Sequence, residues 1–166
     1  MAPRTTEDCF RDHEFQVDVF GIGAAALSNQ ERIIGDHAFG AGIGLNYFFS
    51  RNLGVGLEGN WLSPSSDKDD IGTAGLNVFV RFPCKDTCFA PYAFLGPDVV
   101  FNADEVARGD TPQHSNNDAF LAGHAGLGVE YRFNRTVGIF VDGRYTVVEK
   151  GHNDFGSVRT GFRFAF

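Results

Sequence analysis

Apolar side chains alternate with small, polar or charged ones in eight segments of this chain, and a period of two is typical of β-strands. The segments cover residues 14–27, 37–49, 53–62, 71–82, 91–102, 118–133, 137–148 and 156–166. In the last segment Val158, Phe162, Phe164 and Phe166 fall on one face, and Arg and small residues fall on the other. The chain has 21 Gly residues, which disfavour helices because Gly in a helix interior costs about 1 kcal/mol relative to Ala. We therefore predict an all-β fold of eight strands.

The lengths of the connections indicate how these strands are joined. Connections at 50–52 and 134–136 are tight, and the one at 83–90 is moderate. Longer polar connections alternate with them, at 28–36, 63–70, 103–117 and 149–155. Short turns at one end and long loops at the other are the layout of outer-membrane barrels, whose short turns and both termini face the periplasm. We predict an eight-stranded antiparallel up-and-down transmembrane β-barrel at residues 14–166, preceded by a periplasmic N-terminal segment at residues 1–13.

Charge indicates which face of the predicted strands points into the barrel. The face opposite the apolar one carries acids and Arg, whereas Lys68, Lys85 and Lys150 fall in connections. Arg suits desolvated pairing with carboxylates, because its planar group can donate two parallel hydrogen bonds. We therefore place this face inside, as an ion-pair network that fills the lumen, and the aromatic side chains outside in the lipid. The predicted network comprises Asp18, Glu58, Arg81, Asp98, Glu130, Arg132, Asp142, Arg144, Arg159 and Arg163.

Two other interpretations of this pattern remain open. The inward charges could line a narrow ion path instead of filling the lumen, although eight strands leave room only for side chains or one small ligand. A soluble lipocalin-like barrel would instead turn the Phe-rich face inward around a hydrophobic ligand.

The C-terminal strand carries a further pattern. Arg159-x-Gly161-x-x-Phe164-x-Phe166 resembles the β-signal of outer-membrane proteins, which combines a polar residue, a Gly, a hydrophobic residue and a terminal aromatic. From Phe15 to Phe166 the chain is similar to small outer-membrane barrels of the outer-membrane protein A and X type. This resemblance implies a location in the bacterial outer membrane, contact with outer-membrane lipid, and recognition by the barrel-assembly machinery during biogenesis.

The three cysteines fall in segments that we place on the periplasmic side. Cys9 precedes the first strand, and Cys84 and Cys88 lie in the connection at 83–90. Disulfides persist in the oxidising periplasm, so we predict one disulfide. It is either the local bond Cys84–Cys88 or a bond from Cys9 to one of them, which would pin the N-terminal segment across the barrel mouth. The spacing matches no common zinc site, and we expect no metal and no cofactor.

The expected role is structural, or surface interaction with an extracellular partner through the long loops. A net charge of −7 argues against nucleic acid as a partner, and we expect a monomer that is not an enzyme. The alternatives are a small passive channel and a lipid A-modifying enzyme.

The enzyme alternative depends on a His-x-Ser-Asn element that lipid A deacylases carry. His114-Ser115-Asn116 lacks the intervening residue, Gly151-His152-Asn153-Asp154 lacks the Ser, and His124 has no Ser at matching spacing. The acidic group Asp67, Asp69 and Asp70 lacks the Gly and Glu of an EF-hand loop, so we interpret it as solvated.

Overall fold

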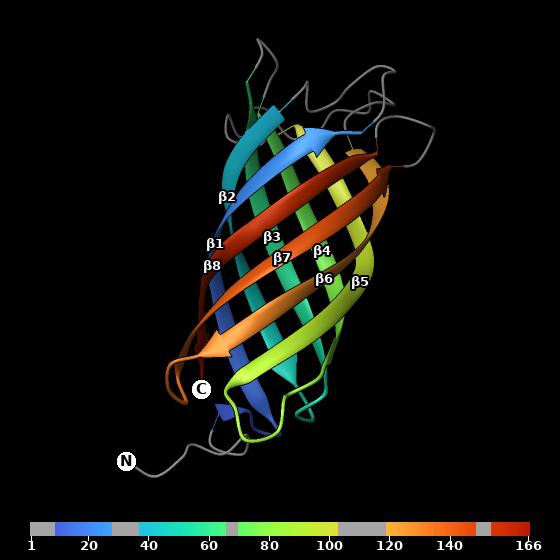
Figure 1. Cartoon of the computed structure of the whole chain (residues 1–166). Coiled ribbons are helices and arrows are strands. Elements are labelled where there is room, and N and C mark those ends of the chain that lie inside the picture. Colours follow the sequence, from blue (N-terminus) through green and yellow to red (C-terminus); the bar gives the residue numbers. More distant parts are fainter. Residues whose placement is uncertain (1–8, 28–36, 66–69, 103–118, 149–153) are drawn as a thin grey trace.

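The computed structural model describes residues 9–27, 37–65, 70–102, 119–148 and 154–166, which form a closed barrel of antiparallel strands. The strands are β1 (Glu14–Ala26), β2 (His37–Phe48), β3 (Leu53–Pro64), β4 (Ile71–Arg81), β5 (Phe89–Asn102), β6 (Ala119–Arg132), β7 (Val137–Val148) and β8 (Phe155–Ala165). Each strand pairs with its neighbours in sequence, and β8 closes the ring on β1 (Figure 1). The predicted fold is confirmed. In the part of the chain described, no helix is long and apolar enough to cross a membrane.

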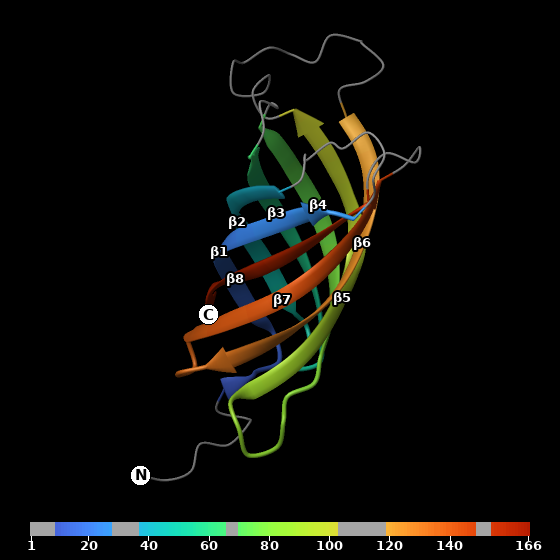
Figure 2. The same cartoon turned by 45° about the horizontal axis from the view of Figure 1, so that its top comes forward.

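Both ends of the barrel sequence meet at the same mouth. Phe15 and Phe166 exchange backbone hydrogen bonds, with N···O distances of 3.3 and 2.8 Å, so the C-terminus lies beside the start of β1. The turns that join β2 to β3, β4 to β5 and β6 to β7 lie at this mouth, as Figures 1 and 2 show from two directions. This arrangement matches the predicted alternation of short and long connections.

The two faces of every strand differ in exposure. Apolar side chains cover the outside, from Phe89 at 37% exposed to Leu127 at 71%. All ten residues of the predicted charged network are buried inside. Asp98, whose strand has an ambiguous alternation around Gly96 and Pro97, is 3% exposed and points inward with the others.

The expectation that aromatic side chains lie outside is wrong for several rings, although the alternation of residues 137–148 already places Phe140 on the inward face. Six aromatic rings pack together in the lumen: Phe20, Phe48, Phe79, Tyr92, Phe94 and Phe140. They fit because Gly residues face them from neighbouring strands. A Cβ on Gly42 would lie 2.6 Å from the Phe20 ring, and a Cβ on Gly54 would lie 2.8 Å from the Phe48 ring. Inward glycines therefore make room for large rings in a narrow barrel.

Candidate functional site

The lumen near the termini is filled by two acids and two Arg side chains with no exposed surface. Glu14 Oε1 accepts from Arg132 Nη2 at 2.9 Å and from Arg81 Nη1 at 3.2 Å. Glu130 pairs with Arg132 Nε and lies 3.7 Å from Arg81 Nη1. Glu14 is absent from the predicted network. The alternation Glu14-x-Gln16-x-Asp18 in the sequence indicates its position, because it places Glu14 on the same inward face as Asp18.

Arg163 connects this cluster to the next layer. Its Nε and Nη2 donate to the two Asp18 oxygens at 2.7 Å each, and its Nη1 donates to Glu130 Oε2 at 2.7 Å. Asn46 also donates to Asp18, at 2.8 Å. Asp18 stands on β1 and Arg163 on β8, so this bidentate pair ties together the two strands that close the barrel.

A second cluster surrounds Arg159. Arg159 donates to both oxygens of Asp142, at 2.7 and 2.9 Å, and to Glu58 Oε2 at 2.7 Å. Arg144 Nη2 lies 2.5 Å from Glu58 Oε1, and Arg144 Nη1 lies 3.7 Å from Asp98. The structure thus brings all ten predicted residues into ion pairs within the lumen.

His124 extends the second cluster through two short contacts. Its Nδ1 lies 2.7 Å from Asp98 Oδ2, and its Nε2 lies 2.7 Å from Asn77 Oδ1. The Asn77 amide nitrogen donates to Glu58 at 2.8 Å, so its oxygen is the atom that faces the imidazole. A carboxylate and an amide oxygen are both hydrogen-bond acceptors, so the imidazole of His124 lies between two acceptors.

The aromatic rings of the lumen pack against the charged side chains of both clusters. The Arg81 guanidinium carbon is 4.0 Å from the Phe48 ring centre, and that of Arg163 is 4.8 Å from the Phe140 ring centre. Such cation–π contacts stabilise a desolvated guanidinium that also keeps its carboxylate partners.

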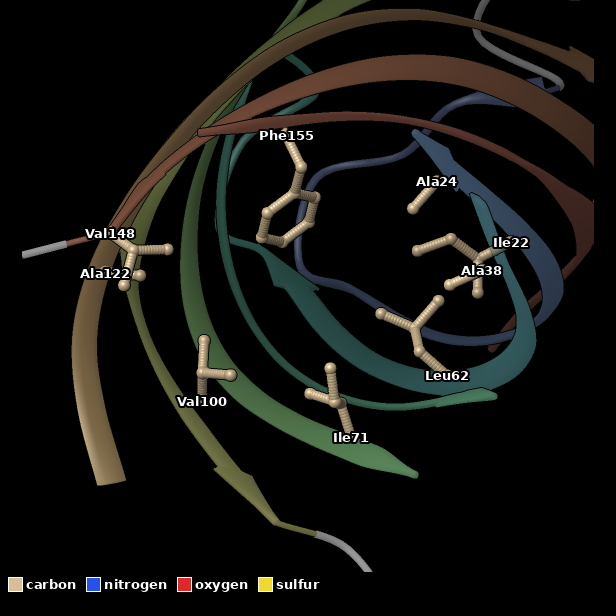
Figure 3. Packing of buried hydrophobic residues seen from close by; sticks show 9 residues of the cluster. All are labelled: Ile22, Ala24, Ala38, Leu62, Ile71, Val100, Ala122, Val148 and Phe155. Carbon is tan, nitrogen blue, oxygen red and sulfur yellow. The ribbon is translucent and has the colours of Figure 1, made fainter. Parts of the chain in front are cut away.

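An apolar layer crosses the lumen at the end away from the termini. All eight strands contribute to it, and its side chains point toward one another inside the barrel (Figure 3). Its members are 0–6% exposed: Ile22, Ala24, Ala38, Leu62, Ile71, Val100, Ala122, Val148 and Phe155. The prediction of a charge-filled lumen did not include this layer. The sequence feature that indicates this layer is an apolar residue at an inward position near the loop end of each strand.

Residues 9–13, which precede β1, lie at the opposite mouth. Cys9 is bonded to Cys88, so the predicted disulfide is the one that ties the N-terminal segment to the β4–β5 turn. The local alternative, Cys84–Cys88, is not formed. Phe10 is fully buried, with the Arg81 guanidinium carbon 4.7 Å from its ring centre. Cys9 and Phe10 therefore lie at the mouth, against the first charged cluster.

The four residues of the β-signal pattern take different positions on β8. Arg159 and Gly161 point into the lumen, where a Cβ on Gly161 would lie 2.6 Å from the Phe20 backbone. Phe164 is half-buried and Phe166 is exposed on the outside. Their role as an assembly signal stays a prediction.

Several predicted features fall outside the described residues: His114, His152, Asp67 and Asp69. Asp70 is described, and its carboxylate accepts from the Trp61 indole at 2.8 Å. Within the described ranges, no group of three or more His, Cys, Asp or Glu side chains is placed to hold a metal ion.

A closed eight-stranded barrel with an apolar, aromatic-rich exterior and a buried charged interior defines a small transmembrane barrel of the outer-membrane class. The chain belongs to the outer membrane protein beta-barrel domain family, whose model matches residues 10–166. No curated protein matches the sequence.

Solved structures with this fold have low sequence identity to the chain. The N-terminal barrel domain of OprF from Pseudomonas aeruginosa is 14% identical, with a TM-score of 0.66 over 94% of this chain and 99% of that one. Ail, the attachment invasion locus protein of Yersinia pestis, is 12% identical, with a TM-score of 0.63 over 93% and 99%. Neisserial surface protein A is 14% identical, with a TM-score of 0.62 over 92% and 96%. At these identities the likeness concerns the fold.

Proposed function

We propose that this protein is a sealed outer-membrane barrel that holds its long loops at the cell surface, where they contact an extracellular partner. In this role it is neither a channel nor an enzyme, and it works as a monomer embedded in outer-membrane lipid. The observation that carries the proposal is the filled lumen: two charged clusters with aromatic rings packed against them are followed, toward the loop end, by an apolar layer.

Ion passage would require both kinds of layer to open. The apolar layer offers a passing ion no polar partner, and transfer of an unpaired charge into such surroundings is strongly unfavourable. The charged layers are paired, and removing one member of a buried pair costs about 3–5 kcal/mol. A water-filled porin needs a polar interior throughout, which this barrel lacks at its loop end.

The architecture of outer-membrane barrels supports an orientation with the termini in the periplasm, and the disulfide is compatible with it. Short turns and termini face the periplasm in barrels of this kind, and the longer connections face outward. Cys9–Cys88 lies at the mouth with the termini, and the periplasm is a compartment in which such a bond persists. We infer that the barrel-assembly machinery inserts the chain in this orientation by recognising the strand that ends at Phe166.

Two proteins with this fold have names that agree with a surface role. One is called an attachment invasion locus protein and has been crystallised with a heparin analogue, and the other is called a surface protein. A catalytic role has less support. A catalytic His would contact a nucleophile through one ring nitrogen, whereas the two ring nitrogens of His124 contact Asp98 and Asn77.

Adherence of bacterial cells tests the surface role. Cells that express the protein are compared with cells that express a variant whose β5–β6 connection, residues 104–117, is replaced by a short Gly-Ser linker. We expect the protein to increase adherence to cultured epithelial monolayers, and the variant to lose that increase while it remains folded in the outer membrane. Equal adherence of both strains, or no increase over cells without the protein, would contradict the proposal.

A further inference from the structure

The outside of the barrel is not uniformly covered by large side chains. A groove of about 970 Å³ runs across six neighbouring strands, from β5 through β6, β7, β8 and β1 to β2. Small residues form its floor: Ala93, Ala125, Gly143, Gly156, Gly23 and Ala25. Larger outward side chains, among them Leu127, Tyr145 and Val158, form its sides. The groove lies on the apolar exterior of the barrel and follows the direction of the inter-strand hydrogen bonds.

The strand register explains the shape of the groove. Leu127 pairs with Gly143, which pairs with Val158 on the next strand. One step further along the strands, Tyr145 stands opposite Gly156. Large and small residues therefore alternate from strand to strand, and the small ones form a continuous zigzag path.

Internal packing does not require the glycines of this path. A Cβ on Gly143 would meet nothing within 4 Å, and a Cβ on Gly156 would first meet the Leu27 side chain, at 3.4 Å. The inward Gly128 differs, because its Cβ would lie 2.5 Å from the Asp142 Cβ and 2.6 Å from the Tyr92 ring. The outward glycines thus leave space open on the side that faces the membrane.

We propose that this groove binds an acyl chain of a membrane lipid from the leaflet at the loop end of the barrel. The groove is continuous with the exterior that contacts the lipid tails, so an acyl chain is the ligand that the surroundings supply. In the orientation proposed above, this leaflet is the outer one; the binding itself requires only that the barrel spans the membrane.

The dimensions of the groove match one leaflet. Five steps between neighbouring strands at about 4.8 Å each give a length of about 24 Å. Because the strands are tilted by ~45°, a groove of this length extends about 17 Å along the membrane normal. One leaflet is half of a hydrocarbon core of ~30 Å, or about 15 Å thick. The path begins at Ala93, inside β5, and ends near His37, the first residue of β2 at the loop end.

Polar atoms gather where a lipid headgroup would begin. The Tyr145 hydroxyl donates to Asp154 Oδ2 at 2.7 Å, and His37 is exposed beside the groove. An acyl chain is surrounded by apolar groups both in the groove and in the rest of the bilayer, so the hydrophobic effect does not favour the groove. The groove favours the chain only through closer van der Waals packing. The expected preference over other outward faces is therefore modest, about threefold.

Photolabelling tests the proposal. The full chain is reconstituted in phosphatidylcholine vesicles that contain phosphatidylcholine with a diazirine near the end of one acyl chain, and labelled peptides are quantified by mass spectrometry. Two variants fill the groove: Gly143→Leu alone, and Gly143→Leu with Gly156→Leu. The matched control is Gly59→Leu on β3, outside the groove, where an added Cβ would first meet a backbone oxygen at 4.0 Å.

We expect label to concentrate on β6, β7 and β8 of the unmodified protein and to fall about threefold in both filled variants. The Gly59→Leu control should keep the original distribution, and the heat-modified gel shift of each variant confirms folding. Uniform labelling of all strands would overturn the proposal. In a parallel sample treated with a bifunctional cross-linker, a barrel-to-barrel cross-link that disappears on filling would also overturn it, because the occupant would then be a second copy. Uniform labelling depends on neither adherence nor conductance, so it leaves the proposed function unaffected, whereas a barrel-to-barrel cross-link would also count against the monomeric state in that proposal.

Discussion

Replacement of Arg163 by Met measures how strongly the lumen depends on its ion pairs. Arg163 is 2% exposed and gives three hydrogen bonds of 2.7 Å to two carboxylates. After the substitution, Asp18 keeps only the Asn46 amide among these partners, whereas Glu130 still has Arg132 and Arg81. Breaking a buried pair by removing one partner costs about 3–5 kcal/mol, and Asp18 accounts for most of that cost here.

The assay is reversible urea unfolding in detergent micelles. Trp61 is the only Trp in the sequence, and it lies on the exterior, so its fluorescence reports the loss of the folded barrel. We expect Arg163→Met to lower the free energy of unfolding by about 3–5 kcal/mol, and Arg163→Met with Asp18→Asn to recover at least about 1 kcal/mol of that loss. The control is Arg51→Met at the exposed rim, where a surface pair with Asp12 at 4.0 Å is worth about 0–1 kcal/mol. A loss below about 1 kcal/mol for Arg163→Met would refute the reasoning.

Three further perturbations address other parts of the molecule. Cys9→Ser should lower the free energy of unfolding by up to about 4.5 kcal/mol, because the disulfide spans 79 residues. Cys84→Ser should leave it unchanged. Equal midpoints of the two variants in non-reducing urea titrations would contradict the assignment of the disulfide to Cys9 and Cys88. Gly128→Ala should lower the free energy of unfolding by about 1–3 kcal/mol through overpacking against Asp142 and Tyr92, whereas Gly143→Ala should leave it nearly unchanged. The opposite order in the same titration would show that the inward and outward faces are misassigned. Phe166→Ala should slow assembly in cells while refolding in detergent proceeds as before, and an unchanged amount of folded barrel in outer-membrane fractions would argue against an assembly role.

The strands and their faces could be predicted because both follow from local alternation. Each observed strand boundary lies within two residues of the predicted one, and every charged residue assigned to the interior is buried. Alternation with a period of two carries this information directly, since a shift of one residue would move a whole strand's charges into lipid.

The partners within the lumen could not be predicted in the same way. Arg163 meets Asp18 across a sequence separation of 145 residues, and this pairing depends on the stagger of the closed barrel. The disulfide partner of Cys9 depends on where the N-terminal segment crosses the mouth. The inward aromatic side chains other than Phe140 were missed because aromatic side chains were assigned to the lipid side, although Gly42 and Gly54 mark the space that Phe20 and Phe48 occupy.

Single-channel recording tests the sealed lumen most directly. The purified barrel is inserted in a planar bilayer with potassium chloride on both sides, and the heat-modified gel shift confirms that the sample added is folded. We predict a silent baseline for the unmodified protein, and conductance steps once the apolar layer and the Arg159 cluster are opened together by Leu62→Gly, Phe155→Gly and Arg159→Ala. Stable, reproducible steps from the unmodified protein would contradict the account, because ions would then cross the ion-pair clusters and the apolar layer that fill the lumen.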